Sequence, residues 1–282
     1  MHNDAGSWLR NTFSDVQSLP TLPQIYLEIK EALAKSDDFS MKSIGQIIEQ
    51  DPSISVRLLK WANSAIFGQR AHVDHVQRAV VVLGIEMVQG LVLSMSVFDA
   101  IKTELQEPKG YSRDGFWQHS LACGLASRWL GKHLGLGDQL SDRAFTAGLL
   151  HDLGKLFEDC YLHQGFVDAV DWAQAQQVTL RDAEKKVMHI THMETGSYLA
   201  QWWDLSPALV EVIRWHHHPH MIATPNKVLD IVHVANALVQ QFGQGSSGNF
   251  EKPKVDQKIW EALNMSKIQL QELKEHIQQV KV

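Results

Sequence analysis

The 282-residue chain is long enough for one large domain or two ordinary ones, and 44% of its residues are apolar while 21% are charged. These values exclude a disordered chain and describe one that folds around a packed core. A net charge of -6 at pH 7, with a sequence pI near 6.2, excludes the basic footprint of non-specific nucleic-acid binding. We therefore expect no nucleic-acid partner.

Segments for export or membrane insertion are also not expected. The sequence holds no run of about 18 apolar residues, and its N-terminus lacks the basic and apolar regions of a secretory signal. The two cysteines, Cys123 and Cys160, are typical of a reducing compartment and give no thiolate metal cluster. We predict a cytoplasmic protein without a membrane partner. The unusual feature is its 15 histidines, which are concentrated in the second half.

The first half predicts short helices separated by capping and turn residues. Leu19–Pro23 contains two prolines that favour an extended entry into a helix over residues 24–34, where apolar residues recur every four positions. Ser40 is a good N-cap for the next helix. Asp51-Pro52 should start a third, because Asp is a favoured cap and Pro has no N–H to leave unsatisfied. This third helix should end near Asn63.

The third helix carries Val56, Leu59 and Trp61 as its apolar residues. Two more helices are expected over residues 73–83 and 85–101, separated by a glycine. The following loop, Glu-Pro-Lys-Gly at 107–110, is the natural boundary between two halves.

The second half is predicted to be helical as well. Its expected helices cover residues 116–133, 140–150, 166–176, 180–203, 207–215 and 228–242. The fourth of these is long, with a break expected near 188–191. Ser206-Pro207 starts the fifth, the glycine-rich stretch 243–248 is a loop or flexible segment, and Ser266 caps a C-terminal helix. Because no period-two alternation is long enough for a sheet, we predict an all-α fold.

The motif that organises the chain is AGLLHDLGK at Ala147–Lys155. Its adjacent His151 and Asp152 offer imidazole nitrogen beside carboxylate oxygen, which suits a divalent transition metal. On its own the pair is weak evidence, because an Asp that starts a helix beside a partly buried His has the same sequence. Other histidines must converge on it, and the candidates are His119, His192, His216 and His217.

Several longer motifs resemble one family. They are LPTLP, IIEQDPSISVRLLKWANSAIFG, AVVVLGIEMVQGLVLS, FWQHS, AGLLHDLGK, THMETGSYLAQWWDLS, VIRWHHHP and VLDIVHVANALV. In this order they resemble the HDOD domain, a bacterial signalling module related to HD-domain phosphohydrolases. The resemblance implies a helical N-terminal lobe (18–107) packed on an HD-like helical lobe (108–242). Residues 1–17 would be an N-terminal extension, and 243–282 a flexible segment with a C-terminal helix.

The resemblance also implies a ligand set for one or two divalent transition metals, such as Fe, Mn, Zn or Ni. By motif, the ligands would be His119, His151, Asp152, His192, His216 and His217. A bridging carboxylate at Asp152 could hold two cations that share a hydroxide for attack on phosphorus. Lys155, one turn beyond His151, could contact a phosphate oxygen, and an ordinary exposed lysine is an equally weighted alternative. If the site is degenerate, no metal would bind.

Three departures from the catalytic pattern argue against a complete enzyme. The late Asp of HD enzymes is replaced by Asn236, and Asp230 should face elsewhere. Gly115 stands where some HD phosphodiesterases have an extra carboxylate ligand, and no Gly-Tyr-Pro motif follows the double histidine. Hydrolysis of cyclic di-GMP is therefore not expected. Three other histidines fit ordinary core or helix-end roles: His189, His218 and His220.

We favour a regulatory module that acts through protein–protein contacts with an unidentified signalling partner, without turnover. The alternative is a metal-dependent phosphohydrolase acting on a nucleotide or another phosphate ester, and a third interpretation is a metal-stabilised scaffold. The sequence does not decide whether the chain forms a homo-oligomer. Part of a binding surface could come from the N-terminal lobe, although Trp61 itself is expected in the core. The candidate surface residues are Arg57, Lys60, Trp61, Asn63 and Ser64.

Overall fold

A computed structural model describes residues 21–35, 41–64, 67, 72–100, 105–251 and 253–278. Every regular element in these ranges is a helix and none is a strand, so the predicted all-α fold is confirmed. Four sequence expectations fall outside the described residues. They are the extension 1–17, the Leu19-Pro20 start of the entry segment, the Ser40 cap and the helix end at Ile101.

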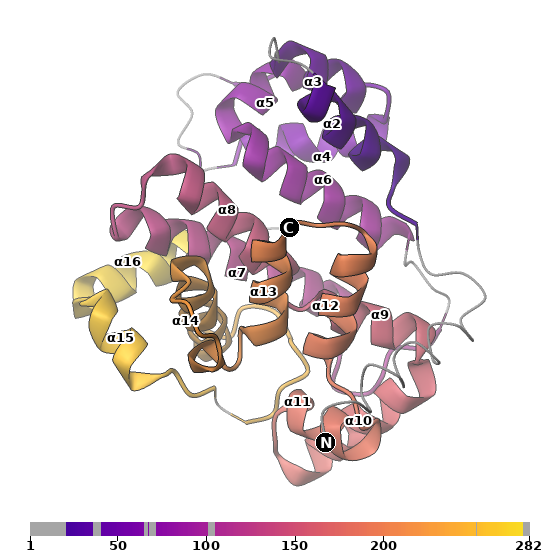
Figure 1. Cartoon of the computed structure of the whole chain (residues 1–282), viewed down its shortest axis with the longest axis vertical. Helices are drawn as coiled ribbons and strands as arrows, with labels where there is room; N and C mark the ends of the chain where they lie inside the picture. Colours follow the sequence, from indigo (N-terminus) through magenta and orange to yellow (C-terminus); the bar gives the residue numbers. More distant parts are fainter. Residues whose placement is uncertain are drawn as a thin grey trace.

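The described helices lie between Gln24 and Gln278 (Figure 1). Their bounds are α2 Gln24–Lys35, α3 Met41–Ile48, α4 Pro52–Ala62, α5 Val76–Leu83, α6 Ile85–Ala100, α7 Arg113–His133, α8 Gly137–Leu150, α9 Leu153–Tyr161, α10 His163–Gln176, α11 Leu180–Val187, α12 His192–Trp202, α13 Pro207–Trp215, the 3-10 turn η2 Pro219–Met221, α14 Lys227–Gln241, α15 Gln257–Leu263 and α16 Lys267–Gln278.

In the N-terminal lobe, the start of α4 is built as its sequence predicts. Asp51 accepts hydrogen bonds from the backbone N–H groups of Ser53 and Ile54, and proline occupies the first helical position. The predicted apolar face of this helix is wrong in one respect. Val56 is 54% exposed, because the face that meets α5 and α6 is formed by residues four apart in sequence. These buried residues are Ile54, Leu58 and Ala62.

Helix caps account for most boundaries in the second half. Ser112 accepts from the backbone N–H of Gly115, so α7 begins three residues before its predicted start. The predicted break in 180–203 is confirmed: His189 has a φ of 59°, in the left-handed region that a right-handed helix cannot contain. A capping box between Thr191 and Glu194 then starts α12.

Two helices, α9 and α15, were not expected from the sequence. All residues from Leu153 to Asp159 in α9 are buried, including one lysine, one glutamate and one aspartate. Leu153, Leu156 and Phe157 recur at helical spacing, but the opposite face, which is polar in sequence, is buried as well.

The two lobes share a hydrophobic core. Leu58 and Met87 of the N-terminal lobe belong to the same buried cluster as Leu125 of α7 and Phe145 of α8. Helix α6 lies between the other N-terminal helices and α8 (Figure 1). The expected packing of one helical lobe on another is therefore confirmed, while the residue boundaries of the domains stay a prediction.

No single helix in the described part of the chain is long and apolar enough to cross a membrane. Helices α5 and α6 reach that length and composition only when taken together, and they are bent by 113° at their junction.

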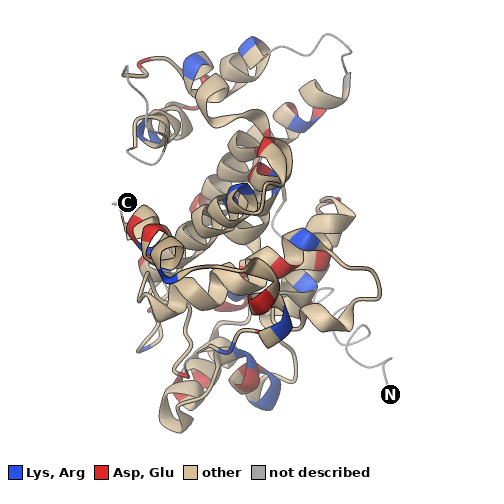
Figure 2. Cartoon of the chain, turned by 90° about the vertical axis from the view of Figure 1, so that its left-hand side faces the viewer, with Lys and Arg blue, Asp and Glu red and all other residues tan. Residues whose placement is uncertain are grey.

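Basic and acidic residues are interspersed along the helices (Figure 2). The predicted lack of a nucleic-acid partner stays a prediction.

Candidate metal centre

His151 and Asp152 lie at the bend between α8 and α9, at the junction of the chain's two largest hydrophobic clusters. Neither side chain is exposed to solvent. The Nδ1 atom of His151 lies 2.7 Å from the carbonyl oxygen of Gly148, one turn back in α8. This contact directs the opposite ring nitrogen, Nε2, toward the Asp152 carboxylate.

The histidines predicted from the motifs surround this carboxylate. On the side of Asp152 Oδ2, the Nε2 atoms of His119 and His151 lie at 3.7 and 3.3 Å. On the side of Oδ1, the Nε2 atoms of His192 and His216 both lie at 3.4 Å.

His217 completes the Oδ1 group. One nitrogen atom from each of His192, His216 and His217 and one oxygen of Asp152 all lie within 4.8 Å of one another. The structure thus brings all six candidate ligands together from five helices, namely α7, α12 and the ends of α8, α9 and α13. Their role as ligands stays a prediction.

Close helix crossings make this convergence possible. A Cβ atom added at Gly154 would lie 1.9 Å from the carbonyl oxygen of His192 and 2.6 Å from Thr195 Oγ1. Gly196 of α12 in turn faces the backbone of Gly154. Because neither position has a side chain, α9 and α12 approach backbone to backbone, which places His192 beside Asp152.

Contacts at Nδ1 orient two of the histidine rings. His192 Nδ1 lies 2.7 Å from Glu184 Oε2, and His216 Nδ1 lies 3.0 Å from the carbonyl oxygen of Ile213. A ring that donates from Nδ1 presents a free electron pair at Nε2, and metal-bound histidines in proteins are held in this way.

The atoms that face the middle of the cluster have no hydrogen-bond partners. Among the described residues, five histidine Nε2 atoms and Asp152 Oδ1 are buried without a hydrogen-bond partner. Buried polar atoms are nearly always paired, so six unpartnered atoms around one point are compatible with a metal site. The five histidines are His119, His151, His192, His216 and His217.

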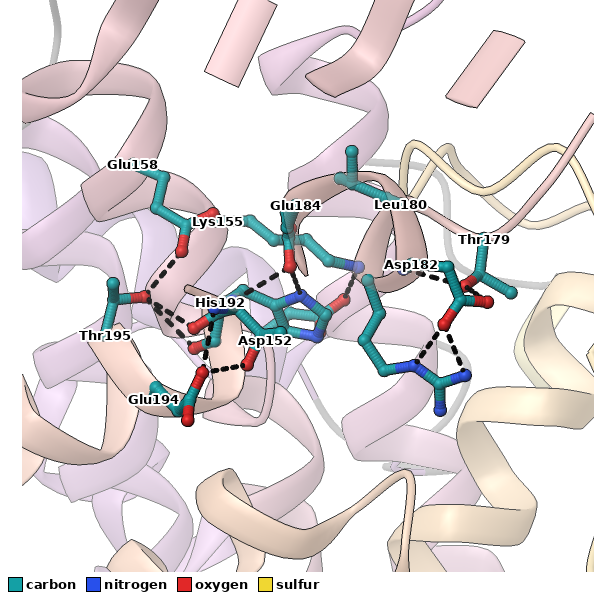
Figure 3. A network of polar contacts seen from close by, with 12 residues as sticks. Asp152, Lys155, Glu158, Thr179, Leu180, Asp182, Glu184, His192, Glu194 and Thr195 are labelled. Atoms are coloured by element: carbon teal, nitrogen blue, oxygen red, sulfur yellow. Dashed lines mark hydrogen bonds and ion pairs between the residues drawn. The ribbon is translucent and has the colours of Figure 1, made fainter. Parts of the chain in front are cut away.

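Behind His192 a second layer of carboxyl groups extends into the protein (Figure 3). Glu184 Oε2 accepts from the backbone N–H of His192 at 2.9 Å, in addition to its contact with the ring. Glu158 accepts from Thr195 Oγ1 at 2.8 Å. Burial raises the pKa of the Glu158 carboxyl well above its usual range, and the charge of Glu184 raises it further.

Electrostatics at this centre favour neutral imidazoles at His119 and His216 and an ionised carboxylate at Asp152, whereas His151 favours its protonated form. Burial lowers the pKa of His119 and of His216 to about 3 in each case, and the charge of His151 contributes. Burial also disfavours the charged form of His151, but the adjacent carboxylate outweighs it and raises the pKa to about 10. Burial tends to raise the pKa of Asp152, whereas the charges of His151 and Lys155 lower it well below its usual range.

Lys155 does not fit the alternative of an ordinary exposed lysine, which is wrong, because its side chain is completely buried. Its Nζ atom lies 2.6 Å from Asp152 Oδ2 and donates to the carbonyl oxygen of Ser247 at 3.0 Å. The loop 243–248 therefore lies against the centre. Contact between Lys155 and a phosphate stays a prediction.

The positions that depart from the catalytic pattern have structural reasons. Asn236 Oδ1 accepts a hydrogen bond from Gln240 Nε2 in α14. A Cβ atom at Gly115 would lie 3.1 Å from Cβ of Ser246, whose N–H bonds to the carbonyl oxygen of Gly115. A larger ligand side chain at that position would collide with the loop 243–248.

Several residues that build the centre were missed by the sequence analysis: Glu158, Glu184, Thr195 and Ser247. Glu184 lies in the segment LRDAEKKV, which has the composition of an exposed helix. No local signal distinguishes a buried glutamate there from a solvated one. The spacing of eight residues between Glu184 and His192, across a helix break, could be interpreted only after the fold was known.

One side of the centre borders a polar cavity of about 260 Å³. His217 lines it together with Asn236 and Arg181, whose Nη2 atom lies 2.9 Å from Asp182 Oδ1. The other five candidate ligands are at most 1% exposed. His217 is thus the ligand through which this cavity meets the cluster.

The motifs, the two packed helical lobes and the His/Asp cluster all point to one family, and a comparison with family profiles decides it. The HDOD domain profile matches residues 19–219 of the chain. The chain belongs to the HDOD family.

The chain is also similar to a curated protein and to three solved structures. An "Uncharacterized protein" of Treponema pallidum (strain Nichols) is 25% identical over 226 residues, which make up 80% of this chain and 43% of that protein. The chain therefore spans less than half the length of this relative.

The solved structures share the fold. An HDOD domain protein of unknown function from Geobacter sulfurreducens has a TM-score of 0.73 and 23% identity, covering 96% of this chain and 87% of its own. A "Putative signal transduction protein" from Marinobacter aquaeolei VT8 has a TM-score of 0.75 and 21% sequence identity. The match covers 98% of this chain and 66% of that one. A "Putative metal-dependent phosphohydrolase" from Shewanella amazonensis SB2B has a TM-score of 0.64 and 18% sequence identity. The match covers 98% of both chains.

Proposed function

We propose that this HDOD protein is a regulatory module that acts through protein–protein contacts and holds a divalent transition metal in its HD-like lobe. The main support for metal binding is a set of buried atoms without hydrogen-bond partners around one point. They are five histidine Nε2 atoms and one carboxylate oxygen. Imidazole and carboxylate ligands suit Fe, Mn, Zn or Ni, and availability would select among them. Bound metal would connect five helical segments, so its binding energy would stabilise the fold.

The seclusion of the centre supports regulation over turnover. The ligands other than His217 are sealed from solvent, and Lys155 is ion-paired with the central carboxylate. Asn236, in place of the late Asp, brings no negative charge and bonds to Gln240. Catalysis at a metal needs an open coordination position that a substrate can reach. In the described part of the chain, only the cavity at His217 offers such access.

A second feature supports partner binding by the N-terminal lobe. Four of the predicted surface residues line a cavity of about 970 Å³ that also involves α6 and the first turns of α7. Trp61, expected in the core, is only partly buried there, beside Phe98 and Trp117, whose ring centroids are 5.4 Å apart. Aromatic side chains of this kind are enriched where proteins bind one another. The partner is a signalling protein, and a cytoplasmic location stays part of this proposal.

The alternative, a metal-dependent phosphohydrolase, is favoured by the polar cavity at His217. Arg181 and Lys254 line this cavity and could bind the oxygens of a phosphate ester, and His217 connects it to the ligand cluster. A bound metal would supply a water of lowered pKa as the nucleophile. The substrate class would be a nucleotide or another phosphate ester.

One experiment separates the two functions. Thermal unfolding is measured with and without a chelator, and the same protein is screened against phosphate monoesters, diesters and nucleotides with added Mn²⁺, Fe²⁺, Zn²⁺ or Ni²⁺. The proposal predicts that chelation lowers the melting temperature by roughly 5–10 °C at a hundredfold excess of metal over its dissociation constant, and that no ester turns over. Turnover that disappears in Asp152→Ala would support the phosphohydrolase and overturn the regulatory proposal.

A further inference from the structure

The two oxygens of Asp152 have different surroundings. Oδ2 accepts a charged hydrogen bond from Lys155 Nζ at 2.6 Å, whereas Oδ1 is buried without a partner in the described part of the chain. Both oxygens face histidines: His119 and His151 on the Oδ2 side, His192 and His216 on the Oδ1 side. The carboxylate therefore has one side already neutralised by a cation and one side still open.

Lys155 is held in place on the occupied side. Its ammonium group also donates to the carbonyl oxygen of Ser247, and no part of its side chain reaches solvent. A transition metal bound to Oδ2 would lie about 2.0–2.2 Å from that oxygen. A dication there would lie next to the ammonium, and two adjacent cations repel each other strongly in a buried, weakly screened site.

The open side offers a complete ligand set. Asp152, His192, His216 and His217 contribute three nitrogens and one oxygen within 4.8 Å of one another. Four ligands of these types satisfy a tetrahedral ion. Two of the rings, His192 and His216, also have their Nδ1 atoms bonded to Glu184 and to the carbonyl oxygen of Ile213.

We propose that the centre holds a single divalent metal on the Oδ1 side, and that the Lys155 ammonium takes the place of a second metal between His119, His151 and Asp152. The inference rests on the proposed metal binding and specifies its stoichiometry and ligands. His119 and His151 then line the centre without binding the ion. Lys155 is a built-in cation rather than a phosphate contact.

The stoichiometry is measured first on the wild-type chain. Metal-free protein is titrated with Mn²⁺ and with Zn²⁺ by calorimetry, and Mn²⁺ coupling is recorded by electron paramagnetic resonance. The inference predicts one ion per chain and an uncoupled Mn²⁺ signal. Two tight ions with a coupled signal overturn it while leaving metal binding intact. Binding of no ion at all overturns the proposed metal centre itself.

Two matched histidine variants locate the ion. His192→Ala removes a ligand on the open side, and the affinity for Zn²⁺ is expected to fall at least 100-fold. His119→Ala removes the corresponding ring on the lysine side, and the affinity is expected to stay within about threefold of wild type. Equal losses in both variants overturn the assignment, provided that each variant keeps the wild-type circular dichroism spectrum.

A third variant tests the role of Lys155. Lys155→Met removes the ammonium but keeps the length of the side chain, so a second ion should bind between His119, His151 and Asp152. Lys185→Met, which changes a lysine in α11 outside the cluster, serves as the control and should bind one ion. A folded Lys155→Met protein that still binds one ion overturns the substitution of lysine for metal. If it does not fold, the wild-type count and the histidine pair decide.

Discussion

At the scale of single residues, Glu184 is the partner that fixes His192. It accepts two hydrogen bonds from this residue, one from the backbone N–H and one from the ring. Carboxylates that orient metal-bound histidines contribute 10–100-fold to metal affinity in other proteins. We expect Glu184→Ala to lower the affinity for Zn²⁺ by roughly that factor, measured by competition with a chromophoric chelator.

The control for this prediction is Glu275→Gln, an exposed position on α16. It should leave the affinity unchanged. Partial recovery in Glu184→Gln, whose amide oxygen can still accept from the ring, would support orientation as the cause. An unchanged affinity in Glu184→Ala would contradict it.

A second residue-scale prediction concerns a buried ion pair outside the centre. Arg113 Nε and Nη2 bind the two carboxylate oxygens of Asp159 at 2.6 and 3.0 Å, and the carboxylate is fully buried. Removing one partner of such a pair leaves an uncompensated charge, which costs about 3–5 kcal/mol.

We therefore expect Arg113→Ala to lower the free energy of unfolding in urea by this amount. The exposed pair Lys132–Asp138 provides the matched control, and Lys132→Ala should change stability by less than about 1 kcal/mol. A loss in Arg113→Ala as small as in the control would contradict the argument.

The six candidate ligands could be predicted from the sequence because they occur in recognisable motifs such as AGLLHDLGK. Their partners could not. Glu184, Glu158 and Ser247 are ordinary residue types in segments that otherwise have the composition of exposed helix or loop. The distinction between the two sides of Asp152 was also out of reach, because it depends on the burial of Lys155.

At the scale of elements, the crossing of α9 and α12 decides whether the ligands meet. Gly154 has no room for a side chain, since an added Cβ would lie 1.9 Å from the carbonyl oxygen of His192. The nearest atom is backbone and cannot move aside without displacing α12. We expect Gly154→Ala to destabilise the fold by about 3 kcal/mol, the upper range for overpacking, and to abolish metal binding.

Gly165→Ala in α10 serves as the matched control, measured by the same urea unfolding and metal titration. Its added Cβ would meet only the flexible side chain of Met188 at 3.3 Å. Alanine is a better helix former than glycine, so stability should stay the same or rise slightly. If Gly154→Ala folds as stably as wild type and binds metal, the proposed helix crossing is wrong.

Prediction of elements succeeded where caps mark the helix ends. Asp51-Pro52, Ser206-Pro207 and Ser266 each precede a helix as expected. It failed for α9, a short helix that directly follows the His151-Asp152 pair and buries the face that is polar in sequence as well. The loop 243–248 gave no sign that it lies against the candidate metal centre.

At the scale of the whole molecule, buried neutral histidines make the metal-free fold sensitive to acid. Burial lowers the pKa of His119 and His216 to about 3, while the unfolded chain has values near 6.5. Between these limits the unfolded state binds more protons, so stability falls as the pH falls. His151, whose pKa is raised to about 10, is protonated in both states below 6.5 and does not change this slope.

The metal-free protein should therefore lose up to roughly 1.4 kcal/mol per pH unit for each of these two histidines between pH 6.5 and 4.5. The measurement is urea unfolding across this range in a chelating buffer. The double variant His119→Gln/His216→Gln should have a shallower pH dependence. An identical slope in the variant would assign the effect to other groups.

The fold as a whole was predictable because the family motifs span most of the chain. What the motifs could not give is that Leu58 and Met87 of the first lobe share a core with Leu125 and Phe145 of the second. Such long-range packing follows from the three-dimensional arrangement rather than from any local pattern.

The most direct test of the central claim is the metal content of the protein purified without a histidine tag or chelator, alongside Asp152→Ala. The account predicts near-stoichiometric Fe, Mn, Zn or Ni in the wild-type protein and almost none in the folded variant. Wild-type protein that is well folded, empty and unable to take up any of these ions would contradict it.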